Sequence, residues 1–134
     1  MKSGITLKEA IKFHGHLGPY LVLGILAGLL ALKKLRCKKY FGLKVIVQGA
    51  LKKPKSCLID GLQLSTGATY GKGNIRKLDG REIKIDFRGP AGYKKVTLKL
   101  RKALIQRLEK TQTHKDSELL AKQLYNTDPL KLFI

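Results

Sequence analysis

The sequence predicts an α+β protein in which a buried N-terminal helix packs on a small, mostly antiparallel sheet and helices form the C-terminal end. Three observations support this expectation. An apolar run without any charge extends from Leu17 to Leu32, β-branched and alternating apolar residues occupy the middle of the chain, and the segment after residue 100 has a helical pattern. Because 134 residues suffice to bury a core, we expect a single domain over residues 1–134.

Two helices are predicted before residue 40. Thr6 can cap the first helix, which is expected to end at Phe13 and to carry Phe13 on its apolar side. Glu9, three residues after Thr6, completes a capping box. Pro19 is well placed as the first residue of the second helix, which extends to about Lys38. That helix is apolar on all sides, and its apolar run is shorter than the ~20 residues of a membrane span. We therefore expect a core helix and no membrane span.

Gly24 and Gly28, four residues apart on the second helix, leave a flat strip where another backbone can approach closely. This strip predicts contact with a second helix of the same subunit or with its copy in a dimer. The sequence alone leaves both alternatives open.

The middle of the chain changes to a strand and then to a short helix. Residues Leu43–Ala50 are rich in β-branched side chains and predict a strand, and Pro54 interrupts the segment that follows. Ser56 is expected to cap a helix over CLIDGLQLST. Three apolar side chains of this helix are expected to face inward: Ile59, Leu62 and Leu64.

The remaining elements are shorter. Asp79-Gly80 predicts a hairpin turn between NIRKL and REIKIDFRG, whose apolar positions alternate strictly. A further strand, KKVTLKL, follows a turn over residues 90–93. Helices are predicted over residues 101–110 and 117–125, and Asp128-Pro129 begins a last short turn.

The chain has a large excess of basic over acidic residues. Lys and Arg number 28 against 9 Asp and Glu, a formal net charge of +19, and no acidic residue stands between Glu9 and Asp60. Such a field attracts polyanions, among them nucleic acids and acidic proteins. The most basic segment, residues 33–41, also carries Tyr40 and Phe41. Lysines on solvated faces, as in heat-adapted proteins, explain the same composition without a partner.

Cysteine use predicts an intracellular protein. The chain has two cysteines, Cys37 and Cys57, which are too few for a disulfide framework. Its first residues lack the apolar core of a signal peptide. We therefore expect reduced thiols and a cytoplasmic location.

Two of the three histidines, His14 and His16, stand in FHGHLGP before the apolar helix. In an extended segment residues two apart face the same side, and the following helix offers free N–H groups to an anion. Imidazole is also the commonest metal-binding side chain. A metal or small-anion pocket is one interpretation, and two ordinary loop histidines are the other.

Cys57 and Asp60 form a second candidate cluster. Their spacing on the predicted helix places thiol and carboxylate on one face, and a position near the helix N-terminus predicts a lowered thiol pKa. A small buried cysteine beside an aspartate that stabilises the helix end is the alternative.

The third cluster is the glycine-rich segment GATYGKGN. It is one residue short of a nucleotide-binding P-loop and lacks the Ser or Thr after its lysine, which excludes a nucleoside triphosphatase of that type. It either cradles an anion through backbone N–H groups or serves as a tight connection.

Together the three clusters resemble the FmdE family of proteins related to formylmethanofuran dehydrogenase. That family has a first motif close to HGHxCP and a second close to C-x-x-D-x-x-Q-x-x-x-G-C-T-x-G-K-G-N, which FHGHLGP and CLIDGLQLSTGATYGKGN match in order, spacing and most identities. The resemblance covers about Leu7 to Leu100, and the DPLKLF ending also fits. It implies an FmdE-like α+β core, commonly an intertwined homodimer. Because no cysteine follows Cys57, the zinc-binding C-terminal domain of some members is not expected.

The resemblance also implies the site residues. The metal or ligand pocket would be lined by His14, His16 and Cys57, with four further residues around it: Asp60, Gln63, Thr69 and Lys72. Two family cysteines are replaced, by Gly18 and Ala68, which removes two thiols. The remaining imidazoles, thiol and carboxylate suit zinc or another transition metal.

Two functions follow from the sequence. The first is an FmdE-like protein with a metal- or anion-binding pocket, acting as an accessory or redox-associated protein beside a larger complex. Lys72 would neutralise the charge of an anionic ligand there. The second is a non-catalytic basic dimer that binds nucleic acid or an acidic protein.

Overall fold

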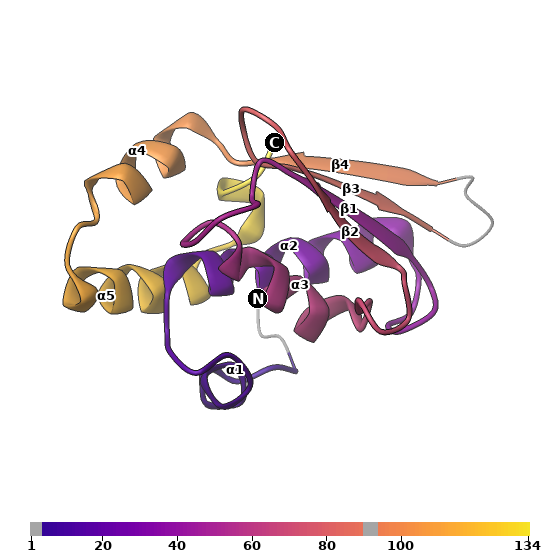
Figure 1. Ribbon diagram of the computed structural model, residues 1–134, viewed down its shortest axis with the longest axis horizontal. Helices are drawn as coiled ribbons and strands as arrows, with labels where there is room; N and C mark the ends of the chain where they lie inside the picture. Colours follow the sequence, from indigo (N-terminus) through magenta and orange to yellow (C-terminus); the bar gives the residue numbers. More distant parts are fainter. Residues whose placement is uncertain (1–3, 90–93) are drawn as a thin grey trace.

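The computed structural model describes residues 4–89 and 94–134. Its elements are α1 (Leu7–His14), α2 (Pro19–Leu35), β1 (Lys44–Gln48), α3 (Cys57–Thr66), β2 (Ile75–Leu78), β3 (Lys84–Arg88), β4 (Lys95–Lys99), α4 (Lys102–Lys110), α5 (His114–Tyr125) and a 3₁₀ turn, Pro129–Lys131. The helices α2 and α3 lie against one face of the sheet (Figure 1). The predicted α+β class is confirmed, while the predicted turn over 90–93 lies outside the described residues.

The four strands have the order β2-β1-β3-β4. β3 pairs antiparallel with β1 and with β4, whereas β1 and β2 are parallel. The sheet is therefore mostly antiparallel, as expected. The predicted hairpin at Asp79-Gly80 is wrong, because β1 lies between the two segments it was expected to join. Parallel neighbours need a crossover connection, and α3 supplies it between β1 and β2.

The beginnings of the helices follow the sequence signals with one exception. Thr6 and Glu9 form the predicted capping box, and Pro19 is the first residue of α2. Ser56, however, makes no side-chain cap bond. The first N–H groups of α3 bond instead to carbonyls of the preceding turn, for example Leu58 N–H to Lys55 O at 3.1 Å. The turn thus replaces the predicted cap.

Two side chains lie farther from the core than expected. Phe13, placed on the apolar side of the first helix, is 55% exposed. In α3, Ile59 and Leu62 are buried as predicted, whereas Leu64 is only half-buried. α5 begins at His114, earlier than predicted, because Thr113 caps it by accepting a bond from Asp116 N–H at 3.0 Å.

The glycine strip of α2 packs against α3 of the same chain. A Cβ at Gly24 would collide with the carbonyl oxygen of Leu58, and one at Gly61 with that of Leu21. Ser65 adds a bond between the helices, donating to the Gly24 carbonyl at 3.2 Å. Of the two alternatives, contact within the subunit is therefore correct, and the strip gives no support to a dimer.

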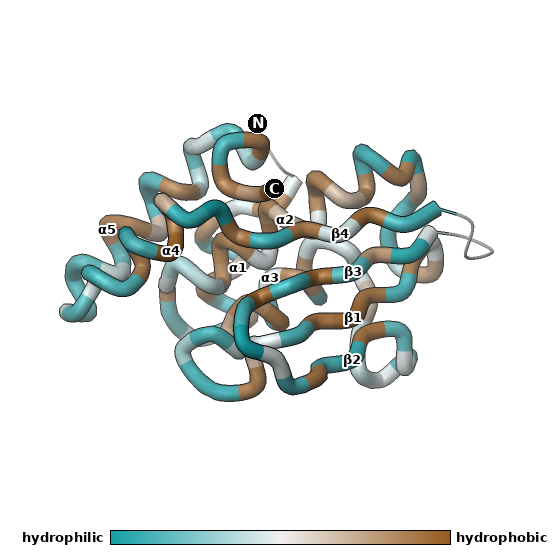
Figure 2. Tube along the Cα trace, turned by 90° about the horizontal axis from the view of Figure 1, so that it is seen from above, coloured by the Kyte–Doolittle hydropathy of each residue, from teal (hydrophilic) through white to brown (hydrophobic). Residues whose placement is uncertain are grey.

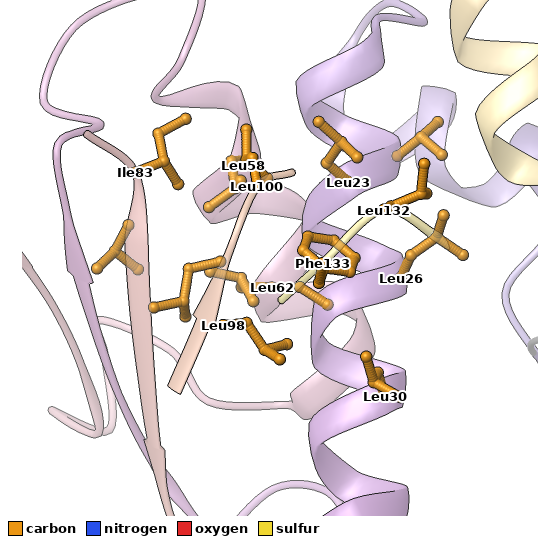
Figure 3. Packing of buried hydrophobic residues seen from close by; sticks show 14 of the residues in the cluster. Leu23, Leu26, Leu30, Leu58, Leu62, Ile83, Leu98, Leu100, Leu132 and Phe133 are labelled. Atoms are coloured by element: carbon orange, nitrogen blue, oxygen red, sulfur yellow. The ribbon is translucent and has the colours of Figure 1, made fainter. Parts of the chain in front are cut away.

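The hydrophobic core lies between α2 and the sheet. Side chains from α2, α3, the strands and the C-terminal segment point toward one another there, with Phe133 close to α2 (Figure 3). The C-terminal segment also pairs with the edge of β4: Ile134 N–H donates to Lys99 O at 2.8 Å and Arg101 N–H to Leu132 O at 2.9 Å.

Among the described residues, no single helix has the length and apolarity to cross a membrane. Only α1 and α2 together reach that length, and they are bent by 117°.

Candidate metal centre

The connection between α1 and α2 brings the two histidines together. His14 is the last residue of α1, and Gly15 reverses the chain in the left-handed conformation, with φ +104°. The two imidazole rings therefore lie side by side, with centroids 4.5 Å apart. The predicted convergence is present, although it arises from a helix end and a turn, and the backbone is extended at Gly18 (φ −146°, ψ 162°).

Asp60, in the first turn of α3, orients His14. The Nδ1 of His14 lies 2.5 Å from Oδ2 of Asp60. A carboxylate accepts the bond, so in the neutral imidazole Nδ1 carries the proton and Nε2 keeps a free lone pair. Nε2 is buried and has no hydrogen-bond partner within residues 4–89 and 94–134. A carboxylate that fixes the far nitrogen of an imidazole is the usual support of a metal-binding histidine.

Cys57 completes a group of three donors. One ligand atom from each of His14, His16 and Cys57 lies within 4.8 Å of the others, so this group could hold a metal ion. Imidazole nitrogen and thiolate sulfur are the donors that zinc prefers. Ligand atoms around a tetrahedral zinc are about 3.5 Å apart, so a small side-chain movement would bring these three to that spacing. Since His16 is exposed, its side chain has room to move.

Two hollows open beside this group. A cavity of about 240 Å³ is lined by His14, Cys57 and Asp60, together with Lys53 and Lys77, and also Ser56, Ile59 and Tyr70. A second, of about 110 Å³, is lined by His16, Cys57, His114 and the start of α2. Cys57 lies at the wall of both, so a ligand in either hollow reaches the donor group.

The electrostatics differ from expectation at Cys57. Burial raises the pKa of its thiol, and the negative charge of Asp60 raises it further, while Lys53 and the local backbone act in the opposite direction. The predicted lowering of the thiol pKa near the helix N-terminus is therefore wrong, because burial and Asp60 outweigh it. Burial and Asp60 also raise the pKa of Tyr70.

The other candidate ligand residues lie on α3 and in the glycine-rich loop, and none of them lines either hollow. Gln63 donates to Asp60 Oδ1 at 3.4 Å and accepts from Tyr70 N–H at 3.2 Å, which ties the loop to the site. Thr69 accepts from the backbone N–H of Lys72 at 3.2 Å. The Lys72 ammonium donates to the carbonyl of Gly67 and lies 5.5 Å from the Phe41 ring centroid.

Among the lining residues that the sequence did not indicate are Lys53, Lys77 and His114. Lys53 stands four residues before Cys57, a proximity that could have indicated it. Lys77 lies on a strand and His114 begins a distant helix, so only the tertiary fold brings them to the site.

The two replaced cysteines occupy different surroundings. A Cβ at Gly18 would lie 3.5 Å from Cε1 of His16, in ordinary contact, so a cysteine there would face the donor group. Ala68 is fully buried in the hydrophobic core and lines neither hollow. The loss at position 18 is thus the one that removes a sulfur beside the histidines.

The basic segment 33–41 has local structural roles. Lys33 and Lys34 stand in the last turn of α2, where cations complement the free carbonyls of the helix end. The ammonium of Lys39 lies 5.3 Å from the centroid of the Tyr40 ring.

Fold and donor set together define a small α+β protein with a His/Cys group that could hold a metal ion. The family model described as "FmdE, Molybdenum formylmethanofuran dehydrogenase operon" matches residues 13–133. The chain belongs to the FmdE family, as its two motifs predict.

A curated relative from Archaeoglobus fulgidus, described as "Probable S-adenosyl-L-methionine-binding protein", is similar to part of the chain. The two are 32% identical over 77 residues, which cover 54% of this chain and 20% of the relative. The chain therefore spans about a fifth of the length of this relative.

Proposed function

We propose that this FmdE-family protein binds one zinc ion through His14, His16 and Cys57 and acts on a small anionic substrate. The observation that carries the proposal is the buried Nε2 of His14, which has no partner among the described residues and whose ring Asp60 holds in the ligating tautomer. Three protein donors leave a fourth position open, which is typical of catalytic rather than structural zinc.

When bound, zinc would supply Lewis acidity, polarising a carbonyl or lowering the pKa of a water molecule. The protein residues have separate tasks. Asp60 keeps the proton on Nδ1 of His14, which leaves the lone pair of the buried Nε2 free for a metal. Tyr70 lines the larger hollow with a raised pKa, which keeps its hydroxyl protonated and able to donate to a bound anion.

The charge of the larger hollow favours an anionic substrate. Lys53 and Lys77 line it together with His14 and Asp60. Lys72 was expected to neutralise the ligand, but its ammonium is engaged by the Gly67 carbonyl. We therefore assign charge neutralisation to Lys53 and Lys77. A cavity of about 240 Å³ suits a substrate of a few heavy atoms, such as a short carboxylate or a phosphate monoester.

The first test is metal content. Purified protein is exposed to zinc, freed of excess metal and analysed by mass spectrometry for metal per chain. We expect about one zinc per chain in the unmodified protein and none in His14→Ala or His16→Ala. His114→Ala is the matched control, because it removes the third histidine of the chain and leaves the three donors in place.

Circular dichroism and urea unfolding would show that each variant is folded. Zinc content that stays the same in both His14→Ala and His16→Ala would contradict the proposal. A homodimer and an accessory role in a larger redox complex stay predictions, which light scattering and co-purification from native extract would test.

A further inference from the structure

The outer face of the sheet is cationic and uncovered. Alternate residues of the strands, among them Val45, Ile85 and Phe87, are buried toward α2 and α3. Their neighbours in sequence point to the opposite side, which none of the described helices covers (Figure 2). Six of these outward side chains are basic: Lys44, Arg76, Lys84, Arg88, Lys95 and Lys99.

The register places three of these cations in one row. Lys44 pairs with Arg88, and Arg88 pairs with Lys95 on the next strand. Side chains directly opposite on neighbouring strands are only about 5 Å apart, and like charges in such pairs destabilise a sheet. Lys44 and Arg88 form no ion pair with an acidic side chain in the described part of the chain. The row therefore opposes folding instead of supporting it.

Acidic groups offset little of this charge. Asp86 is the one acidic residue among the outward positions of the four strands, all of which the structure describes. It accepts a bond from Thr97 at 2.5 Å and lies 4.0 Å from the Lys95 ammonium. Glu82, next to the sheet, pairs with Lys99 at 2.9 Å. The face as a whole keeps a clear positive excess.

We propose that this face binds the sugar–phosphate backbone of a double-stranded nucleic acid. Neighbouring strands space the cations about 4.8 Å apart and alternate residues about 6.6 Å apart along a strand, so the charges form a regular array that suits the regular phosphates of a duplex. Face-to-face contact with a second copy would oppose two cationic surfaces, which disfavours self-association through this side.

The binding recognises phosphates and not bases. The outward positions carry only two apolar side chains, Ile46 and Leu78, and no aromatic ring on which a base could stack. Contacts from Lys and Arg to phosphates position a protein on a duplex without reading its sequence. The affinity should therefore be similar for unrelated sequences and should fall steeply with salt.

The test compares two variants with the same loss of charge. The sheet variant carries Lys44→Gln, Arg76→Gln, Arg88→Gln and Lys95→Gln, all at exposed positions. The control carries Lys102→Gln, Lys110→Gln, Lys115→Gln and Lys122→Gln, which are exposed on α4 and α5. Binding to a fluorescent 20-base-pair DNA duplex is followed by anisotropy at several salt concentrations, and circular dichroism checks folding.

We expect the sheet variant to lose at least about tenfold in affinity at moderate salt, with the slope of log K against log salt reduced by about 3 to 4. The control should keep its slope and stay within about threefold, since it changes only the distant field. A duplex of unrelated sequence should give the same result.

Three outcomes would overturn the proposal. Equal losses in the two variants would mean that the net charge, and not this face, binds the duplex. A strong preference for one sequence would contradict recognition of phosphates alone. Poly-L-glutamate that competes as well as the duplex, with the same sensitivity to the sheet variant, would identify an acidic protein as the partner. We expect the sheet variant to bind as much zinc as the unmodified protein. This test is therefore separate from the test of the metal centre.

Discussion

The α2–α3 contact and the donor group at the ends of the same helices are built in opposite ways. In the contact, Gly24 and Gly61 remove side chains so that two backbones touch, and little freedom is left. In the donor group, His14, His16 and Cys57 converge from a turn and a helix start around open hollows. The comparison indicates that the fold depends on the first region and the proposed zinc binding on the second, so substitutions should separate the two.

The largest effect is expected at Gly61. In Gly61→Val the new side chain would meet the carbonyl of Leu21 and force α2 and α3 apart. We expect a loss of about 3 kcal/mol or more in the free energy of unfolding, measured by urea denaturation. Gly71→Val is the control, because the nearest atom to a Cβ there is Thr69 Oγ1 at 3.8 Å; its effect should stay within about 0.5 kcal/mol. Equal stability of the two variants would contradict the conclusion that the fold depends on the α2–α3 contact.

An intermediate effect is expected at Asp60, where a substitution should change zinc affinity and leave stability nearly unaltered. Asp60→Asn keeps an acceptor for the Nδ1 proton of His14 but removes the negative charge. We expect zinc affinity to fall about 10- to 100-fold, measured by competition with a chelator, with little change in urea stability. Asp116→Asn, also in the first turn of a helix, should leave zinc affinity unaltered. A large loss of stability in Asp60→Asn would mean that Asp60 stabilises the fold instead.

The smallest effect is expected at Gly18, which borders both the α2–α3 contact and the donor group. Its extended backbone accepts a side chain, and its Cβ would face His16. Gly18→Cys should raise zinc affinity by roughly tenfold through a fourth donor, whereas Gly18→Ser, of similar size, should not. Affinities that rise equally for Cys and Ser would mean that position 18 acts through the helix start and not as a ligand.

Elements with local signals could be predicted from the sequence. The capping box at Thr6, the first residue of α2 at Pro19 and the alternation in β3 all depend on neighbours within a few residues. The pairing of β1 with β2 could not be predicted from the sequence, because the pattern of a strand indicates which face is buried and not which strand lies beside it. Asp79-Gly80 therefore suggested a hairpin that the sheet does not contain.

The candidate site divides in the same way. The donors His14, His16 and Cys57 could be named because two motifs carry them, and the family match supports those motifs. The bond from His14 to Asp60 and the approach of Lys77 and His114 join residues far apart in the chain. No local spacing encodes such contacts, and the raised pKa of Cys57 likewise depends on burial that only the fold creates.

The pairing of the C-terminal segment with β4 has a consequence for biosynthesis. Until the residues that bond to Lys99 and Arg101 have left the ribosome, that edge of the sheet presents unpaired N–H and C=O groups. Phe133 is missing from the core for the same interval. The nascent chain should therefore be most prone to aggregation, and most dependent on chaperones, just before residues 132–134 emerge.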